Sequence, residues 1–371
     1  MIATKEKVGH PSCAFGSSHV VDAPQIGEHL REILSLHFHP RHGSRYWLAR
    51  QEELGFDVID RVRRVDDLTL LGFMEPEKLA DRSVWDFVPQ GIQRDRTRFL
   101  TAETGGTAGT PVPTIYSRED FEAAFVSPFV EVATQIGFPI GGQWLFVGPT
   151  GPHIIGKAQR CLAEKMGSPD PWCVDFDPRW VKRLTPGSFA TKRYIDHVID
   201  QATAILHRES ITVLFSTPPI LARIGPLLSE GQREQIAGIH YGGMAISANQ
   251  INEFRQQFPQ AVHLSGYGNT LFGCALETSD VHRHEIEYFP SGPRLLFDVL
   301  CDHEELNEKK YGQLVFHRFD RSMLLVGMKE RDWATLIPPS EVAIKAGLIS
   351  PGIRNPGPPD DTKSKLRLGI Y

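Results

Sequence analysis

The chain has 371 residues, with 40 basic and 45 acidic side chains and a formal net charge of −5. Hydrophobic residues make up 41% of it and charged residues 23%, which is the composition of a soluble globular protein. The near-neutral charge disfavours nucleic-acid binding, and no apolar run is long enough for a signal peptide or a membrane span, so we expect a cytoplasmic protein without membrane contact. Five unclustered cysteines indicate reduced thiols rather than a disulfide framework.

Residues 1–100 are expected to form an N-terminal arm followed by a helical region. Residues 1–25 mix Gly, Pro, Ser and His without a period, which is typical of an arm. His37, His39 and His42 lie in the helical part, and we interpret them as packing residues rather than as metal ligands.

Residues 101–270 are predicted to form an α/β core, because apolar segments of strand length alternate there with amphipathic helical segments. The predicted strands are Gln143–Val147, Cys173–Phe176, Ile211–Phe215, Ile236–His240 and Val262–Ser265. Helices are predicted over Tyr194–His207 and Ser247–Phe258, and another begins at Ser117, whose hydroxyl can cap it. Pro128 is expected to kink or end that helix early.

Residues 271–349 contain short strand-like runs separated by turn residues, which predicts a smaller β-rich, barrel-like subdomain. These runs are Leu271–Glu277, Leu295–Leu300, Leu314–Phe319 and Met323–Met328. Residues 350–371 are rich in Pro and Gly and then charged, and they are predicted to form a tail rather than a further domain.

The sharpest local signal is a glycine-rich loop, Thr104-Gly105-Gly106-Thr107-Ala108-Gly109-Thr110-Pro111. Its glycines allow positive φ, and its amides and hydroxyls can face an anion such as phosphate. It has neither the Gly-Lys-Ser/Thr of a Walker A motif nor the strand-GxGxxG-helix order of a Rossmann fingerprint. Taken alone, such a loop is more often a plain connection than a phosphate cradle.

Further segments favour the phosphate cradle over the plain connection. The loop is similar to the TSGTTGKP phosphate loop of the adenylate-forming superfamily. Three later segments resemble its TPSY segment, its adenine-binding glycine pair and its YGxTE motif: Ser216-Thr217-Pro218-Pro219, Tyr241-Gly242-Gly243 and Gly266-Tyr267-Gly268-Asn269-Thr270. Asp332 falls at the position of its ribose-binding aspartate. The chain most resembles the phenylacetate-CoA ligase branch, over roughly residues 40–335.

This resemblance implies two mixed, mainly parallel sheets packed with helices, together with a small β-barrel-like subdomain. It implies ATP as the cofactor, and a reaction in which a carboxylate attacks the α-phosphate of ATP to give an acyl-AMP and pyrophosphate. Thr107 and Thr270 would be catalytic. The nucleotide would be bound by the loop, the glycine pair and the aspartate, that is by Thr104, Gly105, Gly106, Gly109, Gly242, Gly243, Tyr267, Gly268, Asn269 and Asp332.

The acid would be contacted by Gly266 and His153. His153 follows a predicted strand and stands at the start of a predicted helix, near the carboxyl edge of the sheet where ligands bind. The alternative is a helix-capping turn with an incidental histidine, and the sequence does not decide between the two.

The chain also departs from the superfamily pattern where pyrophosphate and its metal are bound. Ala108 and Thr110 replace a threonine and a lysine of the loop, and Leu271 replaces the glutamate that holds Mg²⁺ in relatives. The resemblance implies Mg²⁺, although its usual ligand is missing here. The alternative to an enzyme is a chain that binds AMP or an aromatic acid without turnover. Cations that could replace the lysine are Lys157, Lys192, Arg193 and Arg223.

Only 39 residues follow Asp332, so we expect the superfamily's C-terminal domain to be absent. In length, tail and lost motifs the chain resembles the stand-alone adenylation proteins of phenazine antibiotic biosynthesis. That resemblance implies an aromatic, phenazine-type carboxylic acid as substrate and an acyl-AMP passed to a separate acceptor such as a partner reductase. A homodimer is the expected oligomer.

Acyl-protein synthetases, which acylate a cysteine near their own C-terminus, are a further alternative. The last cysteine here, Cys301, lies far from the end, which argues against it. His282 and His284, with Cys274, Cys301 and His303, are candidate metal ligands, but their spacing matches no standard cluster and no metal site is predicted.

Overall fold

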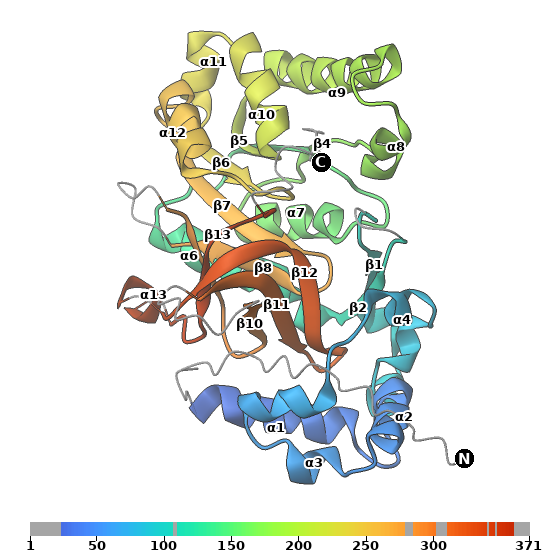
Figure 1. Cartoon of the computed structure of the whole chain (residues 1–371). Coiled ribbons are helices and arrows are strands. Elements are labelled where there is room, and N and C mark those ends of the chain that lie inside the picture. Colours follow the sequence, from blue (N-terminus) through green and yellow to red (C-terminus); the bar gives the residue numbers. More distant parts are fainter. Residues whose placement is uncertain are drawn as a thin grey trace, which may run out of the picture.

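The computed structural model describes residues 24–106, 110–278, 285–301, 310–339, 341–345 and 347–359. Four helices at one end of the molecule form an N-terminal helical region: α1 (Pro24–His37), α2 (Arg45–Leu54), α3 (Val58–Arg61) and α4 (Pro76–Ala80). Short 3₁₀ turns connect them to the rest of the chain. Figure 1 shows this region on the opposite side of the sheets from helices α9 to α12. In the part of the chain that is described, no helix has the length and apolarity needed to cross a bilayer.

Helix α1 is amphipathic, and its buried residues Ile26, Leu30 and Ile33 recur at helical spacing. It lies against the end of β11 (Tyr311–Phe319), where the His29 Nε2 donates to the Phe319 carbonyl at 2.8 Å. His37 is completely buried, as expected of a packing residue.

The same interpretation is wrong for His39 and His42. Both rings are exposed and stack on each other at 5.0 Å, in a turn after α1 that protrudes from the protein. Their neighbours in sequence, Pro40 and Arg41, are exposed as well.

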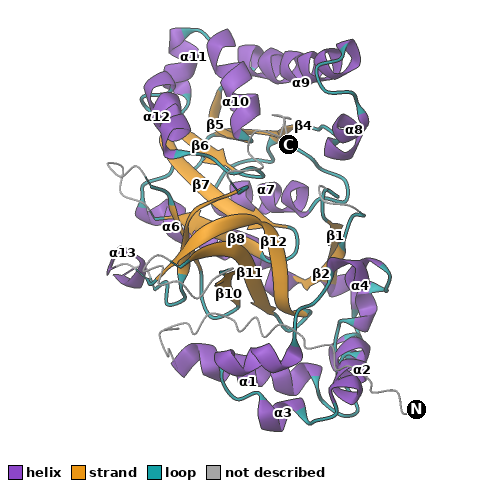
Figure 2. Ribbon diagram, viewed as in Figure 1, coloured by secondary structure: helices purple, strands orange, loops and turns teal. Residues whose placement is uncertain are grey.

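The middle of the chain forms the predicted parallel sheet. Its strands, in spatial order, are β4 (Trp172–Val174), β3 (Gln143–Val147), β5 (Ile211–Ser216), β6 (Gly238–Tyr241) and β7 (Val262–Asn269). Side chains alternate between the two faces, as they do in any strand. One face packs on α6 (Ser127–Gln135) and α7 (Ile154–Lys165), and the other on α9 (Phe189–Arg208), α10 (Pro218–Ile224) and α12 (Ala248–Gln257) (Figure 2). The short helix α11 (Glu230–Gln235) has no buried residue.

Strand β7 joins this parallel part to an antiparallel part. Residues 262–265 pair in parallel with β6, and residues 266–269 pair antiparallel with β8 (Gly273–Glu277). Beyond β8 the order is β9 (Glu287–Pro290), β13 (Gly352–Gly357), β12 (Leu324–Ile337), β11 and β10 (Leu295–Leu300). A separate hairpin, β1 (Phe99–Glu103) with β2 (Pro113–Ser117), carries the glycine-rich loop. The predicted mixed α/β fold is confirmed, although the parallel strands and the β-rich part of the chain belong to one 11-stranded sheet rather than to two sheets and a separate barrel.

Two local expectations differ from the structure. Of the two effects expected of Pro128, a kink or an early end, the end is wrong, because Pro128 does not end the helix that Ser117 caps. The chain runs from α5 (Arg118–Phe121) through a π-helical stretch, Glu122–Val126, into α6, and Pro128 stands in the first turn of α6, where a missing N–H is tolerated.

The segment expected to begin a tail at residue 350 instead supplies β13. This strand lies inside the sheet between β12 and β9, and a short helix, α13 (Glu341–Lys345), precedes it. Its Pro and Gly residues obscure the strand in the sequence. Asn355, at φ 49°, interrupts the regular pairing, while its side chain accepts from the Ile286 amide at 3.0 Å.

Candidate active site

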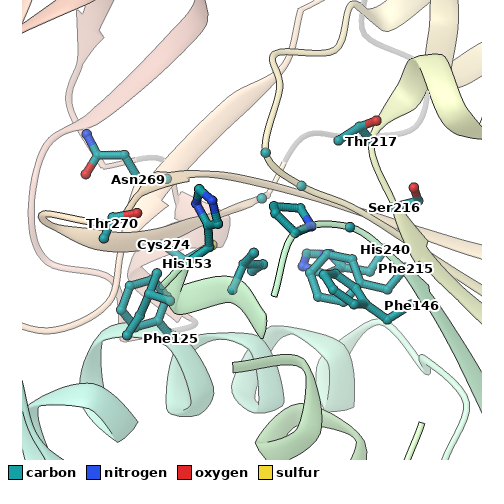
Figure 3. Close-up of a pocket in the computed structure, with 18 of the residues that line it drawn as sticks. Phe125, Phe146, His153, Phe215, Ser216, Thr217, His240, Asn269, Thr270 and Cys274 are labelled. Atoms are coloured by element: carbon teal, nitrogen blue, oxygen red, sulfur yellow. The ribbon is translucent and has the colours of Figure 1, made fainter. Parts of the chain in front are cut away.

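A pocket lies where the parallel strands end, at the carboxyl edge at which α/β sheets bind ligands. Its walls come from the residues that follow β3, β5 and β6, and from β7 and its turn into β8. It has a volume of about 640 Å³, part of which is open to solvent. Figure 3 shows its labelled residues converging from these separate elements.

Aromatic rings form the apolar wall of the pocket. Phe146 and Phe215 stand on neighbouring strands with ring centroids 5.1 Å apart, and Phe215 lies 4.3 Å from the ring of His240 (Figure 3). Phe125 joins this wall from the π-helical stretch, a deviation that is frequent at functional sites. A wall of this kind suits a flat apolar ligand.

His240 gives this apolar wall one polar atom. Its Nδ1 lies 3.0 Å from the Leu264 carbonyl, and because a carbonyl can only accept, Nδ1 carries the proton. Burial lowers the pKa of His240 to about 4, so the ring is neutral at pH 7 and Nε2 is an acceptor. Within the described residues, Nε2 has no hydrogen-bond partner.

Glycines keep the floor of the pocket open. A methyl group on Gly266 would lie 2.9 Å from the Cys274 Sγ and 3.2 Å from the His240 Cε1. One on Gly242 would lie 3.0 Å from the ring of Phe215. Gly243 has φ 80°, a conformation that side chains disfavour.

The structure brings together seven of the residues predicted for the site, all of which line the pocket: His153, Gly242, Gly243, Gly266, Gly268, Asn269 and Thr270. His153 occupies the N-cap position of α7, but its side chain makes no capping hydrogen bond there. It is only 5% exposed, and burial, assisted by the charge of Arg179, lowers its pKa. His153 thus lies in the pocket, as the ligand-contacting interpretation requires, and at the helix start, as the capping interpretation requires.

Tyr267 and Asp332 do not line the pocket, although Tyr267 stands between Gly266 and Gly268, which do. Alternation along β7 directs Tyr267 to the side opposite Gly266 and Gly268, where its ring stacks on Phe272. The Tyr267 hydroxyl donates to the Asp332 Oδ2 at 3.0 Å. The ring of Tyr267 is thus buried in the core, 9% exposed, instead of being presented to a base.

A second carboxylate, Glu330, stands beside this pair. Its Oε1 accepts from the side-chain amide of Asn269, which links β12 to the pocket wall. Burial, and then the nearby charge of Asp332, raise the pKa of Glu330 to about 7. Burial also raises the pKa of Asp332, although the Tyr267 hydroxyl opposes that shift.

The start of the glycine-rich loop is anchored by α8 (Pro178–Arg183). The Arg179 Nη2 donates to the Glu103 Oε2 at 2.9 Å and to the Thr104 carbonyl at 3.0 Å, and the Lys182 Nζ donates to the Gly105 carbonyl at 3.3 Å. Gly106 has φ 63°, which suits glycine. Thr107 and Gly109, the other predicted residues of this loop, lie outside the described residues.

Positive charge gathers near this loop from residues that the sequence analysis missed. Burial, followed by the charges of Arg331 and Arg179, lowers the pKa of Lys182, because the two guanidinium groups repel its ammonium group. Lys157, one of the cations considered from the sequence, instead donates to the Thr101 carbonyl at 2.6 Å. In the sequence, the only sign that Arg331 lies near the site is that it directly precedes Asp332.

The position of the usual Mg²⁺ ligand does not form a metal site. Leu271 is buried, and its amide donates to the Asn269 Oδ1 at 2.8 Å. Among the residues that the structure describes, no group of three His, Cys, Asp or Glu side chains could hold a metal ion. His282, His284 and His303 lie outside the described residues. Cys274 lines the pocket, and Cys301 is exposed at the end of β10.

No family model and no curated protein matches the sequence. The fold matches solved structures of 2-hydroxyisobutyryl-CoA ligase. The match to its postadenylation state in complex with 2-HIB-AMP has a TM-score of 0.61 at 13% sequence identity and covers 91% of this chain and 67% of the ligase. The match to its thioesterification state with 2-HIB-AMP and CoA has a TM-score of 0.58 at 12% identity and covers 88% and 65%. The chain therefore spans about two thirds of the length of this ligase and shares its fold over that part.

Proposed function

We propose that the chain adenylates an aromatic carboxylic acid with ATP. The observation that carries this proposal is one pocket in which three segments distant in sequence converge beside an aromatic wall: those around His153, around Gly242 and over residues 266–270. The fold shared with a ligase whose structure contains an acyl-AMP supports it.

In the proposed reaction, a carboxylate oxygen of the acid attacks the α-phosphorus of ATP. The bond between that phosphorus and the oxygen bridging to the β-phosphate breaks, and pyrophosphate leaves. Catalysis of such a transfer is mostly positioning and stabilisation of developing negative charge. Thr270 at the pocket wall and Thr107 in the loop are the proposed catalytic residues, and Lys182 and Arg331 would supply positive charge near the leaving group.

The adenosine half of the nucleotide would lie between β6 and β12. Asp332 would accept hydrogen bonds from the ribose hydroxyls, while its Oδ2 also accepts from the Tyr267 hydroxyl at 3.0 Å. Gly242 and Gly243 would place backbone, free of side chains, against the adenine. The role of Tyr267 is thus to orient the aspartate rather than to stack on the base.

The aromatic wall indicates the class of acid. Phe146, Phe215 and His240 form an aromatic cluster, with rings inclined by 62° and 46° to their neighbours, that carries an unpaired acceptor on His240. A planar acid of the phenazine type that carries a hydroxyl or N–H donor fits this combination better than an aliphatic acid.

The acyl-AMP would pass to a separate acceptor such as a reductase. Self-acylation is favoured neither at Cys274, which lines the pocket, nor at Cys301, the last cysteine of the chain. Burial raises the pKa of the Cys274 thiol to about 12, and a protonated thiol is a poor nucleophile. Cys301 ends β10, at the edge of the sheet remote from the parallel strands that carry the pocket.

The test is acid-dependent exchange of labelled pyrophosphate into ATP. Phenazine carboxylates should support exchange, and short aliphatic acids should support it at least tenfold less. Binding of AMP and of the acid without any exchange would instead establish the alternative, a degenerate adenylation fold that binds its ligands without turnover. The apolar Leu271 at the metal-ligand position is the observation that favours this alternative. Covalent labelling of Cys301 by the acyl group would indicate an acyl-protein synthetase.

A further inference from the structure

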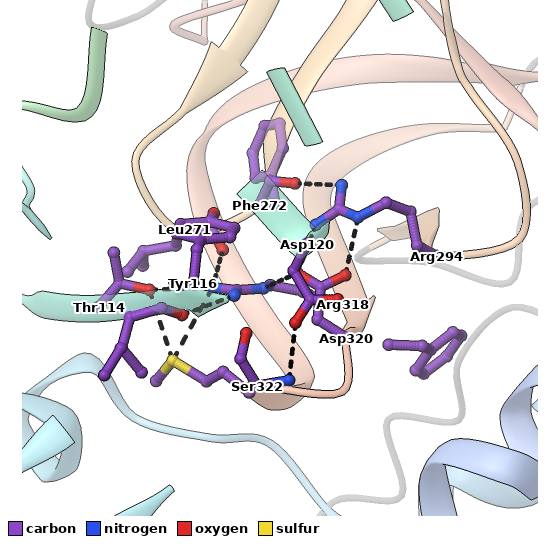
Figure 4. A network of polar contacts seen from close by, with 12 residues as sticks. Thr114, Tyr116, Asp120, Leu271, Phe272, Arg294, Arg318, Asp320 and Ser322 are labelled. Atoms are coloured by element: carbon purple, nitrogen blue, oxygen red, sulfur yellow. Dashed lines mark hydrogen bonds and ion pairs between the residues drawn. The ribbon is translucent and has the colours of Figure 1, made fainter. Parts of the chain in front are cut away.

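The turn from β7 into β8 presents three successive backbone carbonyls, Thr270 to Phe272, to buried side-chain donors. In chain order, these carbonyls accept from the hydroxyl of Tyr116 at 2.9 Å, from Nη1 of Arg318 at 3.0 Å and from Nη1 of Arg294 at 2.8 Å. Figure 4 shows the donors gathered around the turn. The donors belong to β2, β11 and the segment before β10, more than 20 residues away from the turn in every case.

The two arginines are held together by one carboxylate. Asp320 accepts from the Nε of Arg294 at 2.7 Å, from its Nη2 at 2.8 Å and from the Nε of Arg318 at 2.5 Å. Asp320 is 2% exposed and Arg318 is completely buried. Burial alone would raise the pKa of Asp320, but the two guanidinium groups lower it below its ordinary value, so the carboxylate stays charged.

The network also ties the turn to β2. Arg318 donates to the Ile115 carbonyl at 2.8 Å and to the Thr114 hydroxyl at 2.9 Å, and its guanidinium lies 3.6 Å above the ring of Tyr116. Asp120 adds a second carboxylate that accepts from the Ser322 amide at 2.8 Å, so that two buried cations face two buried acids (Figure 4).

Stability alone is a weak reason for such a network. Replacing buried ion pairs by apolar residues of similar volume is often neutral or stabilising, because desolvation of the charges offsets their attraction. What the network does specifically is to saturate every carbonyl of one turn. That turn carries Thr270 into the pocket, next to Asn269.

We propose that Tyr116, Arg318 and Arg294, held by Asp320, are positioning residues that fix the Thr270 turn for contact with the transferring phosphate. None of them lines the pocket, so they act through the backbone they hold. This inference rests on the proposed function for its chemical consequence, while the hold on the turn can be measured independently.

Tyr116→Phe is the sharpest test, because it removes one hydroxyl and keeps the ring beneath Arg318. We expect kcat for acid-dependent pyrophosphate exchange to fall about tenfold, which corresponds to about 1.4 kcal/mol of transition-state stabilisation, with KM for the acid within twofold of wild type. Amide hydrogen exchange in residues 269–273 should accelerate, while that in β3 and β5 stays unchanged.

Tyr241→Phe is the matched control. Tyr241 is equally buried and loses a comparable contact, its hydroxyl to the His263 Nδ1 at 2.6 Å, but its ring packs on Phe254 of α12, away from the pocket. Its kcat and the hydrogen exchange of residues 269–273 should match wild type. Arg294→Lys, which keeps the charge but cannot reach both Asp320 and the Phe272 carbonyl, should reproduce the effect of Tyr116→Phe.

Unchanged hydrogen exchange of the turn in Tyr116→Phe would overturn the positioning role, as would an equal loss of kcat in Tyr241→Phe. If wild type shows no pyrophosphate exchange with any acid, the proposed function fails. Accelerated exchange of the turn amides in Tyr116→Phe alone would then still support the hold on the turn.

Discussion

Asp332 and its partner on β7 are the side chains that bear most directly on the proposed binding of a nucleotide. The Tyr267 hydroxyl donates to one oxygen of the Asp332 carboxylate, while burial destabilises its charged form and raises its pKa. A further hydrogen-bond donor would therefore stabilise the charged carboxylate. A ribose diol supplies such donors, whereas water competes poorly at a half-buried site.

We therefore predict that Asp332→Asn raises the Kd for AMP by roughly 10- to 100-fold, from the roughly 1.5–3 kcal/mol of hydrogen bonds to a charged group. Titration calorimetry measures it. Asp298→Asn is the control, because Asp298 on β10 is also a half-buried carboxylate whose pKa burial raises, here to about 6, yet it lies outside the pocket. An unchanged Kd in Asp332→Asn would remove this residue from the site.

Glu277, at the end of β8, predicts a pH dependence of stability. Its Oε2 accepts from the Ser265 amide at 3.2 Å, and burial raises its pKa from 4.5 to about 7. Between these two values the folded chain holds a proton that the unfolded chain releases. The free energy of unfolding contributed by this group therefore falls as pH rises from about 4.5 to 7 and stays low above that range.

Glu277→Gln abolishes this proton linkage while keeping an oxygen for the Ser265 amide. At pH 8 we expect the variant to exceed wild type in free energy of unfolding by about 1–3 kcal/mol, and at pH 5 we expect the difference to shrink by that amount. Urea denaturation at the two pH values measures both. A difference that is the same at pH 5 and pH 8 would contradict the raised pKa.

At the scale of elements, α8 acts as a brace for the hairpin that carries the glycine-rich loop. Arg179 joins it to Glu103 and Thr104 of that hairpin. Lys182 adds a contact to Gly105. If the chain binds ATP as proposed, anchoring the base of the loop lowers the conformational entropy lost on binding, and this should affect the terminal phosphates of ATP more than AMP.

Arg179→Gln should accordingly raise KM for ATP in pyrophosphate exchange by about 5- to 10-fold, the loss of roughly one charged hydrogen-bonding group, with the Kd for AMP within twofold of wild type. Arg183→Gln on the same helix is the control, since Arg183 is exposed and should leave both values unchanged. Equal weakening of AMP and ATP by Arg179→Gln would indicate a general distortion instead of a brace.

Elements with one clear hydrophobic period were predictable from the sequence. Gln143–Val147 is a strand with the predicted bounds, and the helix predicted from Ser247 begins there because Ser247 and Gln250 form a capping box. The strand predicted from Ile236 begins only at Gly238, because the amide of Ile236 still closes the last turn of α11. Periodicity finds such elements, but not the residue at which one gives way to the next.

The residues of the candidate site also divide into those that the sequence could predict and those that it could not. Gly242, Gly266 and Thr270 were predictable, because each belongs to a short local motif. The ion network around Asp320 was not, since Arg294 lies 26 residues from Asp320 in the sequence and no local motif links the two. A sequence shows which charges exist, whereas burial decides which of them meet.

At the scale of the whole molecule, β13 completes the antiparallel part of the sheet. It is hydrogen-bonded to β12 on one side and to β9 on the other, so it connects the strand that carries Asp332 to the strands next to the pocket. Ile353 is paired with Leu336 on β12 and with Tyr288 on β9, and it is completely buried. The Pro- and Gly-rich composition that predicted a tail therefore hides a structural strand.

Ile353→Ala tests whether β13 supports the fold in solution. Removing three buried carbons should lower the free energy of unfolding by about 2–4 kcal/mol, because the lost apolar burial is compounded by a cavity between two strands that cannot collapse freely. Ile140→Ala, at a position that is 77% exposed, should change it by less than about 0.5 kcal/mol. Chemical denaturation of the full chain measures both. If the two substitutions cost the same small amount, residues 352–357 do not belong to the cooperative core, and the carboxylate of Asp332 must be held in place by β11 and the Tyr267 hydroxyl alone.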